Sequence, residues 1–238
     1  MIKFRKSEER GHANHGWLDS YHSFSFNRYY DPAHMQYSVL RVINEDVIAP
    51  DRGFDMHPHR DMEIVTYMLG GELRHMDSLG NGSVIRTGDV QRMSAGTGVV
   101  HSEFNASSSE SAHLLQIWVL PERKDIEPGY EEKHFARDEK LNQWRLIASH
   151  DARQGSLLVH QDISLFATVL EQGKTLEYQL AEQRSIYLQV ARGSVSLSGQ
   201  VLLAGDAAKV EQLPALQLQA LEDAELLLFD LPAADQTR

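Results

Sequence analysis

Two short segments of the chain carry closely spaced histidine and glutamate residues. The first contains His57 and His59, followed by Glu63, and the second contains His101 and Glu103. Residues two positions apart in a β-strand point to the same face, and Glu63 shares the face of the two histidines if that strand stays regular. If the two segments are neighbouring strands, three imidazoles and a carboxylate meet. Neutral nitrogens with one hard oxygen suit Fe(II), Mn(II), Co(II), Ni(II), Cu(II) or Zn(II).

Spacing alone leaves alternatives to this metal site open. The chain contains twelve histidines, so pairs of this kind can arise by chance. Histidine clusters also serve as pH sensors. The pH-sensor hypothesis, however, gives no reason for the glycine-rich stretch 94–98, which would let the chain bend sharply into the segment that carries His101.

The amino-acid composition excludes several kinds of reactive site and of binding partner. None of the 238 residues is cysteine, which excludes disulfides, cysteine-ligated zinc, iron–sulfur clusters and thiol nucleophiles. The net charge of −11 argues against direct nucleic-acid binding. The apolar runs are too short to span a bilayer, and the first residues lead into charged side chains instead of an apolar stretch. We therefore expect a cytoplasmic protein with no membrane and no direct nucleic-acid partner.

Short apolar alternations, separated by Gly, Asn and Asp, dominate both halves of the chain. Strands are predicted at 37–44, 62–69, 71–78, 83–86, 113–120, 164–170 and 224–231. Strands of this length with frequent turn signals indicate an all-β sandwich or barrel.

The second half repeats the pattern of the first. The segment 186–197 can be laid over 64–73, and a turn and a Gly-Asp pair follow each of them, at residues 88–89 and 205–206. Two copies of one β-unit explain this pattern.

A highly charged segment, 121–140, separates the two copies. It is expected to be a solvated connector with one short helical turn near residues 131–137. We place the domain boundary there, which gives domains 1–138 and 139–238. The last residues, 233–238, are expected to form a loose tail.

The motifs resemble those of a known superfamily. Residues 57–70, with the pattern His-x-His-x₃-Glu-x₆-Gly, match the first cupin motif, and residues 94–105 resemble the second. Within the cupins, the chain is most similar to the pirin family, whose signatures correspond here to residues 10–26, 57–63 and 93–105. In detail it resembles the bacterial pirin-like quercetin 2,3-dioxygenases, over essentially the whole chain.

This resemblance implies a fold and a ligand set. The fold is a bicupin, two double-stranded β-helix (jelly-roll) barrels packed together, with metal ligands in the first barrel only. The implied ligands are His57, His59, His101 and Glu103. They would hold one divalent transition metal ion, Fe(II) before the alternatives Mn, Co, Ni, Cu and Zn. General cupin practice nominates Glu63 instead of Glu103, but we favour Glu103 because the pirin-type His-x-Glu pair is intact.

The resemblance also implies an activity and partners. The expected reaction opens the flavonol quercetin, or a related enol, with dioxygen and releases carbon monoxide. Glu103 is the first candidate for the catalytic base and Glu63 the second. The alternative is a metal-dependent transcriptional co-regulator or redox sensor that acts through a protein partner, and a third candidate is a cupin isomerase or lyase. We expect a monomer.

Residues beside the ligands have two interpretations each. A slot for a flat aromatic substrate could be lined by apolar residues of the predicted strands, although ordinary core packing is favoured: Val65, Tyr67, Met93, Leu115 and Ile117. The aromatic run 17–30 is expected to pack as a strand over the barrel in preference to forming the mouth of the pocket. His12, His15 and His22 are expected to make structural hydrogen bonds.

Overall fold

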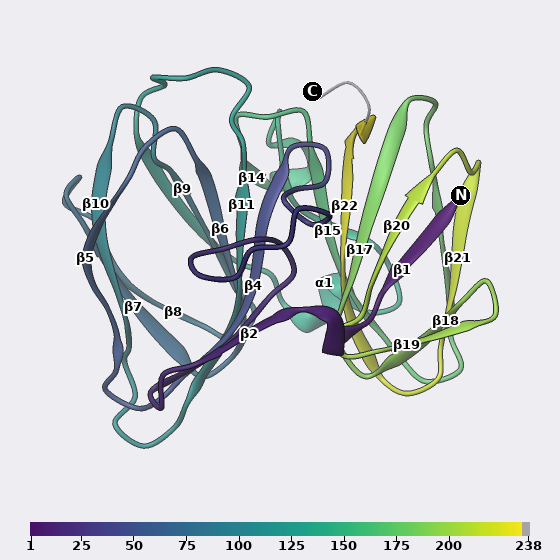
Figure 1. The fold of residues 1–238 in the computed structure, drawn as a ribbon, viewed down its shortest axis with the longest axis horizontal. Coiled ribbons are helices and arrows are strands. Elements are labelled where there is room, and N and C mark those ends of the chain that lie inside the picture. The colour runs from purple at the N-terminus through teal and green to yellow at the C-terminus, as the bar shows by residue number, and fades with distance from the viewer. Residues whose placement is uncertain (235–238) are drawn as a thin grey trace.

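The computed structural model describes residues 1–234, so the end of the expected tail, residues 235–238, lies outside the described part of the chain. Two seven-stranded and two four-stranded sheets make up nearly all of the regular structure, which confirms the predicted all-β class. Figure 1 shows these sheets as two barrels lying side by side. The helices η1 (Ser7–Glu9), α1 (Arg137–Lys140) and η2 (Arg153–Gly155) are short. Within residues 1–234, no helix has the length and apolar character that a membrane crossing requires.

The N-terminal barrel packs a seven-stranded sheet, in the order β12-β9-β6-β11-β4-β3-β2, against a four-stranded sheet, in the order β5-β10-β7-β8. Its strands are β2 (Gly11–Asn14), β3 (Leu18–His22), β4 (Leu40–Ile48), β5 (Gly53–His59), β6 (Glu63–Gly70), β7 (Glu72–Asp77), β8 (Gly82–Arg86), β9 (Asp89–Ser94), β10 (Val99–Asn105), β11 (Ala112–Val119) and β12 (Gly129–His134).

The C-terminal barrel has the same arrangement, with orders β1-β20-β17-β22-β15-β13-β14 and β16-β21-β18-β19. Its strands are β1 (Ile2–Arg5), β13 (Arg145–Ser149), β14 (Leu157–Leu158), β15 (Ser164–Leu170), β16 (Thr175–Gln179), β17 (Arg184–Arg192), β18 (Ser194–Leu197), β19 (Gln200–Leu203), β20 (Ala207–Glu211), β21 (Ala215–Ala220) and β22 (Ala224–Pro232). The turns after β6 and β17 both need glycine, because Gly71 and Gly193 each have a φ of +70°. The predicted repeat and bicupin fold are thus confirmed.

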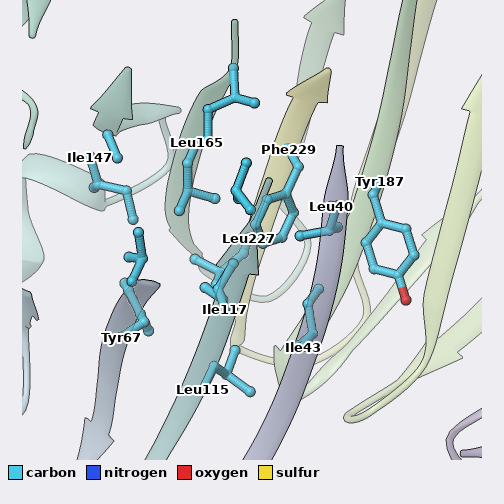
Figure 2. Close-up of a cluster of buried hydrophobic side chains, with 14 of the residues drawn as sticks. Leu40, Ile43, Tyr67, Leu115, Ile117, Ile147, Leu165, Tyr187, Leu227 and Phe229 are labelled. Atoms are coloured by element: carbon cyan, nitrogen blue, oxygen red, sulfur yellow. The ribbon is translucent and has the colours of Figure 1, made fainter. Parts of the chain in front are cut away.

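The largest buried cluster lies between the two seven-stranded sheets, where both barrels contribute side chains (Figure 2). Successive side chains of β6 point to opposite faces of the sheet, so this one strand contributes to two different cores. Val65 and Tyr67 pack in this cluster with residues such as Phe229 of β22, whereas Ile64 and Met68 belong to clusters inside the N-terminal barrel. Strand β6 is consequently buried on both faces.

The connector differs from the prediction. Strand β12 occupies 129–134 and pairs with β9, where Tyr130 lies opposite Met93, and the helical turn α1 begins only at Arg137. The side chains of β12 are half-buried or exposed, as on an edge strand, so no apolar alternation marks it in the sequence. Because β12 extends the first barrel, we propose that the domain boundary lies between residues 138 and 139. Strand β1 is an exception, since it pairs with β20.

Candidate metal centre

The two predicted ligand segments are neighbouring strands. Strand β5 carries His57 and His59, and β10 carries His101 and Glu103. They pair antiparallel with His101 directly opposite His57. The register shifts between His101 and Glu103, which places Glu103 opposite Phe54. The condition on which the sequence analysis depended, that the two segments form adjacent strands, is therefore met.

The close approach of β5 to β10 depends on Gly53. A Cβ atom at this position would lie 2.1 Å from the backbone oxygen of Glu103. Any side chain would push the strands apart at the end of the pair nearest to Glu103. The glycine thus sets the spacing at which the predicted ligands of the two strands face one another.

The structure gathers the three predicted histidines at one point. The ring centroids of His57, His59 and His101 lie 4.4–4.9 Å apart. One nitrogen from each ring falls within 4.8 Å of the other two. Glu103 belongs to a second group, with His101 and His75, whose ligand atoms also lie within 4.8 Å of one another. The motif analysis missed His75.

Two of the three imidazoles, those of His59 and His101, are in the neutral form that a metal requires. The Nδ1 atom of His57 lies 2.7 Å from the backbone oxygen of Asp55, so Nδ1 must donate to this oxygen and Nε2 is the nitrogen left to bind a metal. Burial, reinforced by the neighbouring imidazoles, lowers the pKa of His59 to about 4 and that of His101 to about 3. Both rings are therefore unprotonated near neutral pH.

Two buried atoms of the site lack protein partners. Within residues 1–234, neither His101 Nε2 nor Glu103 Oε1 has a hydrogen-bond partner, although both are shielded from solvent. The other carboxylate oxygen, Glu103 Oε2, accepts a 2.8 Å bond from Gln116 Nε2. Because buried polar atoms are nearly always paired, this pair of free acceptors beside two more imidazoles fits a divalent cation.

An aromatic-walled cavity of about 350 Å³ opens beside His57, His59 and Glu103. Its aromatic wall comes from Trp17, Phe26, Phe54 and Trp118. The Trp118 ring meets His59 edge-on, with centroids 5.0 Å apart. The aromatic run 17–30 therefore does more than pack over the barrel, because it supplies strand β3 and also two residues of the aromatic wall, Trp17 and Phe26.

The apolar residues proposed as a slot lie elsewhere. Val65, Tyr67, Leu115 and Ile117 belong to the core between the barrels, and Met93 belongs to a separate cluster inside the N-terminal barrel. The favoured interpretation, core packing, is confirmed for all five residues, and the alternative of a substrate slot is wrong. Strand parity is the reason: on β11 the neighbours of opposite parity, Gln116 and Trp118, face the cavity.

A buried acid in the cavity wall was also missed. Asp46 of β4 lies beside Asn44 in the lining and accepts a 2.5 Å bond from Ser20 Oγ. Burial, with added repulsion from Glu103 and Glu45, raises its pKa to about 7. The sequence held one signal for this buried acid. Asn44 and Asp46 are polar residues at alternate positions of β4, a strand whose even-numbered residues are buried.

Glu63 does not share the face of His57 and His59. Strand β5 ends at His59, the chain turns at Asp61 with a φ of 49°, and Glu63 begins β6 in the opposite sheet. Its Oε2 accepts bonds from Ser94 Oγ at 2.9 Å and from the backbone nitrogen of His160 at 3.1 Å. Glu63 therefore sits where the two barrels meet, and its catalytic role stays a prediction.

Two of the three N-terminal histidines make the expected structural hydrogen bonds. His12 Nε2 lies 2.6 Å from Asp19 Oδ1, and His22 Nδ1 lies 2.8 Å from Asn44 Oδ1. His15 lines the cavity instead. Within residues 1–234, none of the three belongs to either of the two residue groups whose ligand atoms lie close enough together to hold a metal ion.

Comparison with known proteins identifies the family. The pirin family model matches residues 3–119, and the model of the quercetinase C-terminal cupin domain matches residues 146–231. A quercetin 2,3-dioxygenase of Escherichia coli K12 is 48% identical over 98% of this chain and 99% of its own length. A pirin-like protein of Caulobacter vibrioides is 40% identical over 97% of this chain and 99% of its own length.

Solved structures agree with this assignment. The bacterial pirin YhhW of Escherichia coli, in complex with nickel(II), superposes with a TM-score of 0.93 at 48% identity, covering 98% of this chain and 100% of that one. A quercetin 2,3-dioxygenase of Acinetobacter baumannii gives a TM-score of 0.78 at 25% identity, covering 98% and 86% of the two chains. The chain belongs to the pirin family, as a two-barrel cupin protein.

Proposed function

We propose that this protein is an oxidoreductase that opens quercetin, or a related aromatic enol, with dioxygen and releases carbon monoxide. One observation carries the proposal: the free acceptor atoms of a three-histidine, one-glutamate set lie beside an aromatic-walled cavity. The relative of 48% identity, matched over nearly its full length, bears the name quercetin 2,3-dioxygenase.

The residues that would hold the metal are His57, His59, His101 and Glu103. When bound, a divalent cation supplies the positive charge that acidifies an enol hydroxyl and a common anchor for the two reactants. We propose Fe(II) as the native metal. Mn, Co, Ni, Cu and Zn are alternatives that the same donor set accepts, and the YhhW structure contains nickel(II).

The protein side chains supply a base and a dry, shaped cavity. Gln116 holds one oxygen of Glu103 and leaves Oε1, which would act by turns as a metal ligand and as the acceptor of the enol proton. Trp118 and Phe26 offer ring surfaces against which a flat aromatic molecule can pack and exclude water. Among the two candidate bases, Glu103 is favoured because it lines the cavity, whereas Glu63 is bonded to Ser94 and His160.

The proposed partners are a small aromatic enol such as a flavonol, and dioxygen. We propose that the protein acts on them as a monomer in the cytoplasm. The acid excess argues against direct contact with nucleic acid.

Oxygen consumption by the metal-loaded protein tests the proposal. The apo-protein is loaded in turn with Fe(II), Mn(II), Co(II), Ni(II), Cu(II) or Zn(II), and oxygen uptake, loss of quercetin absorbance and carbon monoxide are measured. We expect uptake with at least one redox-active metal. The His57→Ala variant should lose both metal and turnover, whereas His113→Ala, which removes a histidine bonded to Glu45 outside the site, should keep both. Absence of uptake with every metal would reject the proposal and favour the co-regulator alternative.

A further inference from the structure

A fourth histidine lies against the metal centre. His75 is on β7, beside β10, in register with Glu103, and its side chain is completely buried. Its Nε2 lies 3.1 Å from Asp77 Oδ2 and its Nδ1 lies 3.5 Å from Nδ1 of His101. The ring of Tyr130 stacks on it, with centroids 4.7 Å apart. His75 thus links a buried carboxylate to a ligand of the site.

The bonds around His75 fix the position of its proton. Asp77 accepts hydrogen bonds from the backbone nitrogens of Leu79 and Asn81 and from the side chain of Asn81, each at 2.9 Å. Its carboxylate is therefore an acceptor, and Nε2 of His75 must donate to it. The Nδ1 atom of a neutral His75 then carries a lone pair. The side-chain nitrogen of Gln91, 3.4 Å away, points a donor at the same atom.

The position of the proton on His75 also determines the tautomer of His101. If Nδ1 of His75 is an acceptor, Nδ1 of His101 must carry the hydrogen that lies between them. The other nitrogen of His101, Nε2, then has a free lone pair, and this is the buried atom without a partner in residues 1–234. We propose that His75 is a positioning residue that fixes the tautomer and ring orientation of His101, so that Nε2 presents its lone pair to the metal.

The two ligands of β10 would then be held from two sides. His101 is held from β7 through His75, and Glu103 is held from β11 through Gln116, whose own oxygen accepts a 3.3 Å bond from Trp118 Nε1. Outer partners of this kind typically change metal affinity about 10–100-fold when removed. The inference rests on the metal site of the proposed function but not on its reaction.

Cobalt(II) binding to variants of the full chain tests the role of His75. His75→Phe keeps a ring for Tyr130 but removes both nitrogens, and His75→Asn keeps an acceptor oxygen close to the position of Nδ1. We expect His75→Phe to bind Co(II) about 10–100-fold more weakly and with an altered visible spectrum. His75→Asn should recover most of the affinity. The control His113→Phe should bind like the wild type, and thermal unfolding of the apo-proteins checks that each variant folds.

The wild-type protein provides a second test that needs no variant. Long-range ¹⁵N–¹H NMR of the apo-protein reports imidazole tautomers, and we expect His75 protonated on Nε2 and His101 on Nδ1. The opposite tautomers would overturn the inference, as would wild-type affinity and spectrum in His75→Phe. Loss of Co(II) binding in both variants would also overturn it, by making His75 a direct ligand. If the wild type binds Co(II) as expected but consumes no oxygen, this inference stands and only the proposed reaction fails.

Discussion

Asp46 shows how one residue in the cavity wall makes folding depend on pH. Its pKa of about 7 lies far above the ordinary value of 3.8, because burial penalises the charged form. Between these two values the folded protein holds a proton that the unfolded chain has released. Stability from this group is therefore complete below pH 4 and is lost as the pH rises through 7.

Substitution of Asp46 by Asn should remove this loss. Asn cannot ionise and can still accept the hydrogen bond of Ser20, so Asp46→Asn should be more stable than the wild type at pH 8, by up to about 4 kcal/mol. At pH 4.5 the difference should shrink to about 1 kcal/mol, because this pH lies less than one unit above the ordinary pKa of the carboxyl group. Urea unfolding at both pH values measures the difference. A gap of the same size at both would refute the assigned pKa.

The two candidate bases can be separated by matched substitutions. Glu103→Gln should lower kcat about 10²–10⁴-fold, because the side chain beside the reacting atoms can no longer accept a proton. Glu63→Gln should lower it much less, since that carboxylate contacts Ser94 and His160. Steady-state oxygen uptake with equal metal loading, checked by elemental analysis, measures both. Equal losses, or the reverse order, would reject this assignment.

At the scale of residues, local spacing determined what could be predicted. The pairing of His57 with His59 could be predicted because alternate positions in one strand share a face whatever the rest of the fold. Glu63 was placed on the face of the two histidines only if the strand stayed regular, and that condition fails because a turn at Asp61 moves the chain to another sheet. His75 was missed because its approach to His101 depends on the pairing of β7 with β10, which no local pattern encodes.

The pairing of β5 with β10 is the element on which the centre depends. Gly53→Ala would force a Cβ against the backbone of Glu103. We expect a loss of about 1–3 kcal/mol of stability together with weaker metal binding. Gly82→Ala on β8 is the matched control, since its new Cβ would meet nothing closer than 3.9 Å. Urea unfolding and Co(II) titration of both variants measure these effects, and equal behaviour of the two would contradict the role of Gly53.

Strands with apolar alternation were predicted well and edge strands poorly. The segments 62–69 and 164–170 fall within one residue of β6 and on β15 because their apolar residues bury a whole face. Strand β12 was predicted as connector because it gains its hydrogen bonds from β9 while burying little of its own surface. Parity within β11 also could not be assigned from sequence, since both faces of that strand are buried or half-buried.

At the scale of the molecule, the cluster between the barrels couples their stabilities. Phe229 is fully buried there, among residues of both seven-stranded sheets. We expect Phe229→Ala to cost about 3–5 kcal/mol and to lower one shared unfolding transition. The exposed Leu203→Ala on the same barrel should change stability by less than about 0.5 kcal/mol. Two separate calorimetric transitions in the wild type, with only the second affected by Phe229→Ala, would contradict this coupling.

Strand β1 joins the first residues of the chain to β20, more than 200 positions later, as the pairing of Ile2 with Val210 shows. During synthesis the N-terminal barrel has all of its own strands available once β12 has left the ribosome. The first strand must then wait, unpaired, until β20 emerges. Residues 2–5 are thus among the last to take their place in the fold, although they are among the first to be synthesised. An extension fused in front of them would disturb the C-terminal barrel sooner than the N-terminal barrel.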